Sequence, residues 1–175
     1  MLAGLFKRRN TEITAAESLY LSAVEAARRP VLFAELGVPD TMDGRYEMVA
    51  LHVYLVLRRL KRDHPATAEL AQALFDFMFV DFDNTLREAG VGDLGVGRRV
   101  KQMATGFYGR IAAYDAGLDG SDPNEALRRN AYGTVAVDDR ALDRLGTYFK
   151  DADQALAGQS TDGFLAGRAT FPDIA

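Results

Sequence analysis

The sequence contains no cysteine and only two histidines, His52 and His64, among its 175 residues. The lack of cysteine excludes disulfide bonds, thiolate nucleophiles and cysteine-held zinc or iron–sulfur sites, and it is compatible with a reducing compartment. The two histidines occur in no Glu-x-x-His or His-x-x-x-His spacing, so we predict no carboxylate-bridged metal pair. Two histidines and scattered serines do not define a nucleophile–base–acid triad either.

Long hydrophobic runs and an excess of positive charge are also missing. The longest apolar runs, Met48–Leu51 and Val53–Leu57, are separated by His52 and fall far short of the roughly 20 residues that span a bilayer. The net charge is −4 and the pI is about 5.2. Because a protein that binds nucleic acid over its whole surface is expected to be basic, we predict no DNA partner.

The first ten residues, MLAGLFKRRN, place apolar side chains before a basic cluster. A secretory signal is longer and has the opposite order. One hypothesis is a weak membrane contact, with the apolar side chains in lipid and the basic ones on anionic headgroups. The residues concerned are Leu2, Leu5, Phe6, Lys7, Arg8 and Arg9. The alternative is a frayed terminus.

Apolar residues recur at helical spacing in nearly every segment of the chain. Thr14 and Glu17 form a capping-box pattern that predicts the start of a first helix, ending near residue 28. The apolar face of residues 45–62 is unusually wide, so this helix is expected to be central. Further helices are predicted at 30–36, 66–89, 94–116, 122–133 and 138–157, with a last turn at 161–167.

No strand of useful length is recognisable, so we predict an all-α, single-domain bundle of six to eight helices. Residues 1–13 are expected to be a flexible terminus, residues 14–158 the helical domain, and residues 159–175 a turn and tail. The glycine-rich segment 90–97 resembles a phosphate loop but follows a helix and lacks the closing Gly-Lys-Ser/Thr. We interpret it as a helix–helix turn, with Gly90 ending one helix and Asp93 capping the next.

Two kinds of small-ligand chemistry can be considered. Asp76, Asp81 and Asp83 suggest a magnesium–diphosphate site of the prenyl-diphosphate type. Asp81 and Asp83, however, lie about 200° apart around a helix and cannot share an ion, so a solvated or salt-bridged face is favoured. His52 borders the apolar face of the central helix and could ligate haem or line a site for an apolar ligand. A hydrogen-bonded structural histidine is the more common case.

The helix at 94–116 has two glycines, Gly106 and Gly109, that each cost about 1 kcal/mol relative to alanine. Arg99 and Arg110 lie three turns apart on one side of it. One interpretation is a backbone-lined groove flanked by guanidinium groups, and the other is close packing against a helix of the same domain. The phenylalanine-rich stretch 75–82 is similarly either core or partly exposed partner surface.

Two segments together carry a family resemblance. They are DTMDGRYEMVALHVYLVLRRL, residues 40–60, and ALFDFMFVDFDNTLREAGVGDLGVGRRVKQMATGFYGRIAAY, residues 73–114. They resemble the ubiquinol–cytochrome c chaperone family, whose members include the mitochondrial cytochrome b assembly factor and its alphaproteobacterial relatives. The resemblance extends over roughly residues 36–149. The specific features are Asp-Gly-Arg before a leucine-rich helix, then the Phe/Asp-rich helix, Gly-Val-Gly-Asp-Leu and Phe-Tyr-Gly-Arg.

The resemblance implies a helical chaperone that assists assembly of respiratory complex III without catalysing a reaction. It implies no catalytic residue, metal or cofactor. The expected partners are cytochrome b or another complex III subunit, with the ribosome exit region or a small co-chaperone as further partners of mitochondrial members. The sequence starts without the long targeting extension of those members, so we expect a bacterial protein, cytoplasmic or peripheral on the inner membrane. The candidate partner-binding residues are Arg45, Phe77, Phe79, Asp81, Arg99, Lys101, Tyr108 and Arg110.

Overall fold

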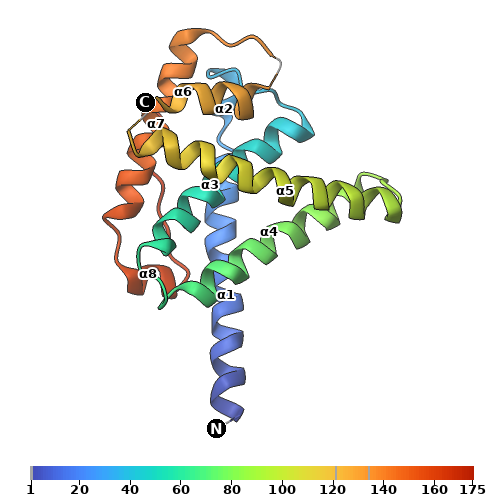
Figure 1. Cartoon of the computed structure of the whole chain (residues 1–175), viewed down its shortest axis with the longest axis vertical. Helices are drawn as coiled ribbons and strands as arrows, with labels where there is room; N and C mark the ends of the chain where they lie inside the picture. The colour runs from blue at the N-terminus through green and yellow to red at the C-terminus, as the bar shows by residue number, and fades with distance from the viewer. Residues whose placement is uncertain (1, 121, 134) are drawn as a thin grey trace.

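The structure is a computed structural model. It describes the backbone of residues 2–120, 122–133 and 135–175, and the side chains of the same ranges from residue 12 onward. Within these ranges the chain is helical and contains no β-strand, which confirms the predicted all-α class (Figure 1). In chain order the elements are α1 (Leu2–Ala27), α2 (Pro30–Ala34), α3 (Met42–Lys61), α4 (Ala68–Glu88), α5 (Asp93–Leu118), α6 (Pro123–Leu127), the π-helical turn η1 (Arg128–Tyr132), α7 (Asp139–Ala157) and α8 (Thr161–Leu165).

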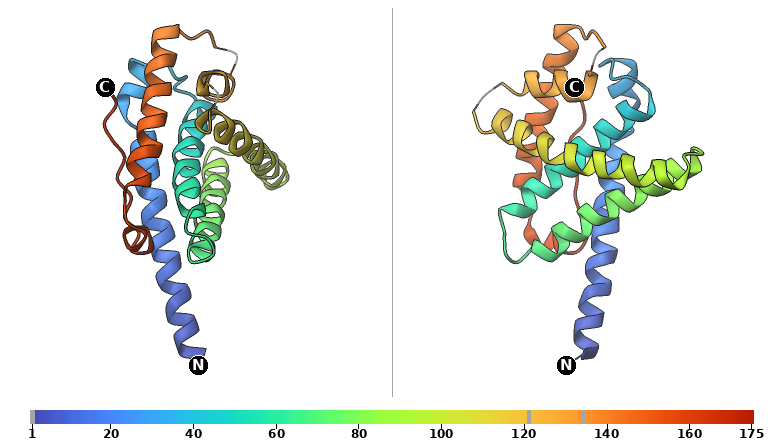
Figure 2. Two further views of the ribbon diagram at one scale, coloured as in Figure 1. Left: turned by 60° about the vertical axis from the view of Figure 1, so that its left-hand side comes forward. Right: turned by 45° about the vertical axis from the view of Figure 1, so that its right-hand side comes forward.

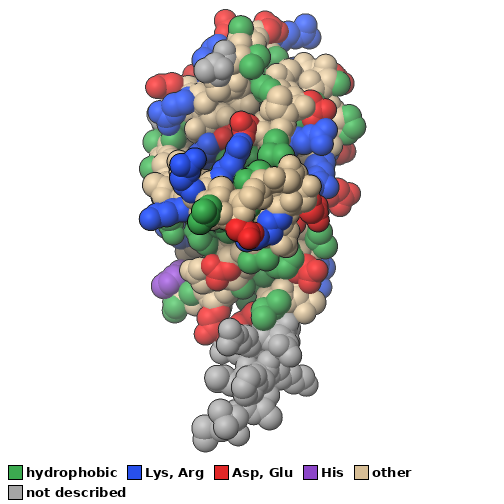
Figure 3. All heavy atoms as spheres, turned by 90° about the vertical axis from the view of Figure 1, so that its right-hand side faces the viewer, with side chains coloured by type: hydrophobic (Ala, Val, Ile, Leu, Met, Phe, Trp, Pro, Cys, Tyr) green, Lys and Arg blue, Asp and Glu red, His purple; other side chains and the backbone are tan. Residues whose placement is uncertain are grey.

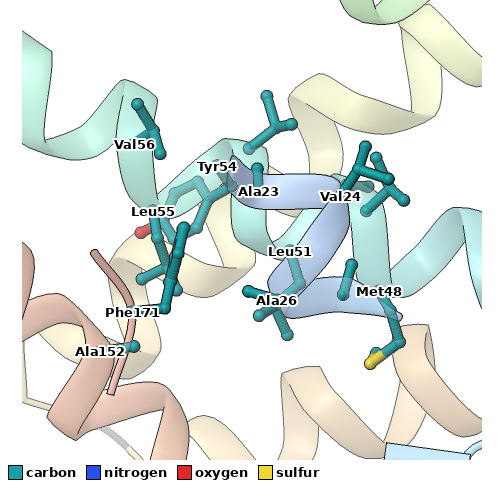
Figure 4. Packing of buried hydrophobic residues seen from close by; sticks show 14 of the residues in the cluster. Ala23, Val24, Ala26, Met48, Leu51, Tyr54, Leu55, Val56, Ala152 and Phe171 are labelled. Atoms are coloured by element: carbon teal, nitrogen blue, oxygen red, sulfur yellow. The ribbon is translucent and has the colours of Figure 1, made fainter. Parts of the chain in front are cut away.

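Helix α3 is the centre of the fold, as its wide apolar face predicts. Most of its side chains are buried, and it packs against α1, α4 and α7. Figure 4 shows Met48, Leu51 and Tyr54 of α3 close to Ala23 and Ala26 of α1. Because the alanine side chains of α1 are small, the larger side chains of α3 fit against the α1 backbone and fill the space between the two helices.

Helix α1 passes along the body and continues beyond it at its N-terminal end (Figures 1 and 2). It packs on α3 and α4 and, toward its middle, meets the turn that ends α8. Gly167 in that turn has φ +75°, and a Cβ there would lie only 2.9 Å from the Cβ of Ser18. Glycine is therefore required both for the turn and for the close approach of the C-terminal segment to α1.

Helices α4 and α5 converge on a short turn, and their ends at that turn project from the body (Figures 1 and 2). We call this helix pair, with its connecting turn at residues 89–92, the arm. Phe75 and Phe79 of α4 pack against Phe107 of α5 with tilted and edge-on rings, the centroids 5.9 and 6.2 Å apart, and so join the two helices. Gly90 ends α4 with φ +82°, which confirms the predicted glycine turn.

Two predicted helix starts are wrong. Helix α1 begins at Leu2, so Thr14 lies inside it and forms no cap; the Thr14 carbonyl instead accepts a hydrogen bond from the Ser18 hydroxyl at 3.0 Å. Helix α5 has Gly92 at its N-cap position, and Asp93 is its first residue. The Asp93 carboxylate makes an ion pair with Arg87 of α4, a tertiary contact that replaces the predicted local cap.

Candidate functional site

A groove of about 1490 Å³ lies between the arm and the first three helices. One wall comes from the end of α1, from α2 and from the beginning of α3. The other comes from the second half of α4 and from α5. Few backbone contacts join α3 to α5, so side chains from both helices bridge the groove.

The segment before α3 forms one rim of the groove because Gly44 lets it come close. A Cβ on Gly44 would lie 1.9 Å from the Pro39 carbonyl oxygen, which is impossible without moving the backbone. The Thr41 hydroxyl accepts the Gly44 N–H at 3.1 Å and caps α3, and the Asp40 carboxylate accepts Arg45 Nε at 2.6 Å. This hydrogen bond lowers the pKa of Asp40. The Asp-Gly-Arg motif thus has a structural explanation. Gly44 allows the close approach of the Pro39 backbone, and Arg45 holds Asp40 at the rim of the groove.

A buried ion pair spans the inner end of the groove. Arg110 Nε donates to Glu47 Oε2 at 2.7 Å, and Arg110 Nη2 donates to the other carboxylate oxygen. The guanidinium carbon also lies 5.4 Å from the centre of the Tyr46 ring. Glu47 is 9% exposed, and this burial raises its pKa against the opposing effect of Arg110. Such bidentate geometry fixes the orientation of both side chains and holds α5 against α3.

Gly106 makes room for this pair. A Cβ at Gly106 would lie 2.7 Å from Arg110 Nη1, so the absence of a side chain lets the guanidinium fold back along α5 toward Glu47. Gly109, by contrast, has no atom within 4 Å of a Cβ built there and faces open space. The two glycines therefore do not form the continuous backbone-lined groove considered from the sequence.

At the outer rim, the Arg99 guanidinium donates to Asp43 at 2.8 Å, and both side chains are exposed. Exposed pairs of this kind contribute roughly 0–1 kcal/mol, so water or another polar group can replace either partner at little cost. The two ion pairs that join α3 and α5 across the groove therefore differ in kind. The inner one is buried and bidentate, and the outer one is exchangeable.

The floor of the groove is aromatic. The Tyr46 ring packs edge-on against Phe82 with centroids 4.9 Å apart, and its hydroxyl donates to the Met103 carbonyl at 3.3 Å. On the α1 side, the Tyr20 hydroxyl donates to Asp81 Oδ2 at 2.6 Å. Burial and the Asp81 carboxylate raise the pKa of Tyr20, so the phenol stays protonated and Asp81 remains its acceptor.

The structure divides the eight predicted partner-binding residues into three groups. Arg45, Asp81, Arg99 and Arg110 line the groove, which brings together residues from three helices. Phe77 and Phe79 are half-buried packing residues: Phe77 lies against Tyr20 with ring centroids 5.3 Å apart, and Phe79 belongs to the joint between α4 and α5. Lys101 and Tyr108 are exposed and do not line the groove.

Several residues that line the groove were not among those predicted from the sequence. They include Tyr46, Glu47 and Asp43, all within the segment that carries the family resemblance. Glu47 was the strongest available signal, because a carboxylate at a buried position of an apolar helix requires a partner. Its partner, 63 residues away, could not be read from local spacing.

His52 is a structural histidine with no nitrogen available for haem iron. Its Nδ1 donates to the Met48 carbonyl at 2.7 Å, which leaves Nε2 to accept the Tyr148 hydroxyl at 2.7 Å. The ring is fully buried against Phe171, and burial lowers its pKa to about 4. His52 is therefore not placed to ligate haem, and the haem alternative depended on this residue.

The three acidic residues of α4 do not converge either. Asp76 accepts from Gln72, Asp81 from Tyr20, and Asp83 pairs with Arg87. Within the described side chains, no group of three His, Asp or Glu residues is placed to hold a metal ion. The geometry thus offers no support for the magnesium–diphosphate alternative.

The predicted membrane-contact side chains lie outside the described residues. They are Leu2, Leu5, Phe6, Lys7, Arg8 and Arg9. Within the described part of the chain, none of the helices combines the length and apolar character needed to cross a bilayer.

The sequence and fold were compared with known proteins. Ubiquinol-cytochrome c reductase complex assembly factor 1 of Mus musculus and that of Homo sapiens are each 27% identical to this chain over 153 residues, 86% of its length. The chain spans about half of these relatives, 52% and 51%. The crystal structure of the Cbp3 homolog from Brucella abortus has a TM-score of 0.86 and 38% identity, covering 99% of this chain and 98% of that one.

The family model described as Ubiquinol-cytochrome C chaperone matches residues 34–171. This range contains every groove-lining residue except Tyr20, Arg28, Pro30 and Phe33. Since the match covers well over half of the sequence and the Brucella structure has the same fold, the chain belongs to the ubiquinol–cytochrome c chaperone family.

Proposed function

We propose that this protein is a non-catalytic assembly chaperone of the ubiquinol–cytochrome c reductase complex, and that the groove is where it binds its client. The observation that carries the proposal is the groove itself, with an aromatic floor and charged rims, in a chain of this chaperone family. The names of the mammalian relatives, complex assembly factors, support the assignment to this complex.

The size of the groove favours a polypeptide segment as the ligand. Sites for small molecules typically measure about 300–1,000 Å³, and this groove is larger. Phe33, Met42 and Met103, which are half-buried or exposed in the lining, offer an apolar surface on which a helix or an extended segment can lie. The proposed client is cytochrome b or another subunit of the complex, because a newly made membrane protein exposes apolar segments before assembly.

The rim ion pairs make such binding reversible. Asp43–Arg99 and Asp40–Arg45 are exposed, so a client's polar groups can replace one partner without a large desolvation cost. The buried Glu47–Arg110 pair keeps the walls in place while this exchange occurs. Charge at the rim then selects the client and its orientation, and the apolar part of the lining supplies most of the affinity.

The cellular setting is part of the proposal. The protein acts on the cytoplasmic side of the membrane, where its N-terminal residues Leu2–Arg9 contact lipid. A small co-chaperone or the ribosome exit region serves as a second partner, as the family resemblance implies.

Capture from cells that make tagged cytochrome b tests the proposal. The wild-type protein should be recovered with cytochrome b well above an unrelated helical protein. Arg45→Glu reverses charge at the exposed rim and should reduce recovery about tenfold, since charge reversal at an interface costs one or more kcal/mol. Arg140→Glu, an equal charge change at an exposed position of α7 outside the groove, is the matched control. Equal recovery of the two variants would refute the groove as the client site.

A further inference from the structure

The outer face of α5 carries a line of exposed side chains that the groove does not use. Leu94, Arg98, Lys101, Thr105 and Tyr108 follow one another at steps of four, three, four and three residues, so they form one stripe along the helix. From Leu94 to Tyr108 the stripe is about 21 Å long, at 1.5 Å per residue. We call these five residues the α5 stripe.

The ends of the stripe are apolar or aromatic. Leu94 is 96% exposed at the tip of the arm, and Tyr108 is 62% exposed at the other end. Tyr108 also contacts Phe75 of α4, with ring centroids 5.8 Å apart, whereas Leu94 is almost wholly exposed. Leu94 therefore has no packing role within the described part of the chain.

The middle of the stripe is basic and unneutralised. Neither Arg98 nor Lys101 makes an ion pair with a described residue, whereas Arg99 and Arg110 on the groove side are both paired. From Leu94 to Tyr114 the sequence has four cations and no carboxylate, in a protein of net charge −4. In the space-filling view onto the end of the arm, Lys and Arg side chains gather at mid-height on the left (Figure 3).

We propose that the α5 stripe is a second membrane-contact surface, which binds bilayers containing anionic lipid. The interface of a bilayer accommodates all three kinds of side chain at once: Leu94 in the acyl boundary, Arg98 and Lys101 on phosphates, and Tyr108 at the headgroup level. This surface is separate from the groove and from the N-terminal residues, and it goes beyond the proposed chaperone function.

The shape of the stripe favours a membrane over the other ligands that basic residues attract. A partner helix usually binds in a groove, whereas the stripe is an exposed line of side chains on a helix that projects from the body (Figure 1), and it suits a flat surface. A nucleic acid would use the cations but leave Leu94 exposed to water. The contact is small, so it acts together with another membrane-binding element, in the way that stable anchoring usually takes two signals.

Sedimentation with vesicles tests the charge of the stripe. The full chain should bind vesicles of equal parts phosphatidylglycerol and phosphatidylcholine, and not vesicles of phosphatidylcholine alone. The variant Arg98→Gln/Lys101→Gln should bind about 30-fold more weakly, since each basic residue near an anionic surface contributes about 1 kcal/mol. Arg140→Gln/Lys150→Gln removes the same charge from exposed positions of α7 and should bind like the wild type.

A fluorescent probe tests the depth of the contact. The chain has no tryptophan, so Leu94→Trp introduces a single fluorophore at the tip of the arm. Its emission should shift to the blue when anionic vesicles are added. Leu165→Trp, at an exposed position of α8 away from the tip of the arm, should show no shift.

Three results would overturn the proposal: no binding to the anionic vesicles, equal weakening by the two double variants, or an unchanged Leu94→Trp emission. Loss of binding only when Lys7, Arg8 and Arg9 are replaced would equally overturn it, because it would assign the whole contact to the N-terminus. These assays contain no client, so their outcome is independent of the capture experiment on the groove.

Discussion

Replacing Arg110 with methionine tests how the groove is held together. Methionine keeps an unbranched apolar stem but removes the charge that compensates Glu47, a carboxylate only 9% exposed. Leaving a buried charge unpaired costs about 3–5 kcal/mol. Protonation limits this cost, because neutralising a carboxyl of ordinary pKa at pH 7 takes about 3.7 kcal/mol. We therefore expect the free energy of unfolding to fall by about 3 kcal/mol at pH 7.

The loss should depend on pH with a definite sign. Burial already raises the pKa of Glu47, and removal of Arg110 raises it further. The folded variant then retains a proton that the unfolded chain releases, so the destabilisation is greatest at pH 7 and shrinks as pH falls toward the ordinary carboxyl pKa. Comparing variant and wild type at each pH cancels the titration of other groups, His52 included.

Thermal unfolding followed by circular dichroism at pH 7 and pH 5 measures this effect. For a protein of this size a 3 kcal/mol loss lowers Tm by roughly 6–12 °C. The double variant Glu47→Leu/Arg110→Met removes both charges and should regain most of the stability, as apolar replacements of buried pairs usually do. A double variant as unstable as Arg110→Met, or a loss equal at both pH values, would refute the assignment of the effect to an uncompensated charge.

Further predictions concern packing and buried hydrogen bonds. Gly44→Ala should lower the free energy of unfolding by about 2 kcal/mol or more, because its Cβ meets the Pro39 carbonyl, whereas Gly109→Ala should raise it by up to about 1 kcal/mol because its Cβ meets nothing. A urea titration of both variants checks this, and a loss on Gly109→Ala equal to that on Gly44→Ala would contradict it. Tyr148→Phe leaves His52 Nε2 buried without a donor and should cost about 1–3 kcal/mol in the same assay; an unchanged midpoint would show that the hydrogen bond contributes nothing.

The ion pair between α3 and α5 has a consequence for the proposed function. Glu47 and Arg110 fix α5 beside the groove, and Asp115 of α5 joins the same two helices further along by accepting from Tyr54 and Arg58 of α3. The Asp43–Arg99 pair further out is exposed and weak, so the outer part of the groove can adapt while the inner part stays fixed.

Much of the fold was predictable because helix formation is recorded in local spacing. The apolar face of α3 indicated a central helix, and Gly90 marks the predicted turn, where the backbone has positive φ. The helix predicted from residue 122 also starts there, since the Asp122 carboxylate accepts the Asn124 N–H and caps α6. The predicted caps at Thr14 and Asp93 were wrong. A capping residue can cap a helix only if the helix begins next to it, and local sequence does not fix where a helix begins.

The amino-acid sequence by itself determined the all-helical class, the central helix, the absence of cysteine chemistry and the family resemblance, because all of these depend on residue type and on spacing within one segment. Only the tertiary structure decided which faces meet. It joined Glu47 to Arg110, 63 residues apart in the sequence, and gave both ring nitrogens of His52 partners inside the fold. It used Phe77 and Phe79 for packing between helices and placed Lys101 and Tyr108 outside the groove. The reason is physical: helical periodicity shows that a side chain lies on a given face, while its partner across the fold is chosen by the packing of the whole core.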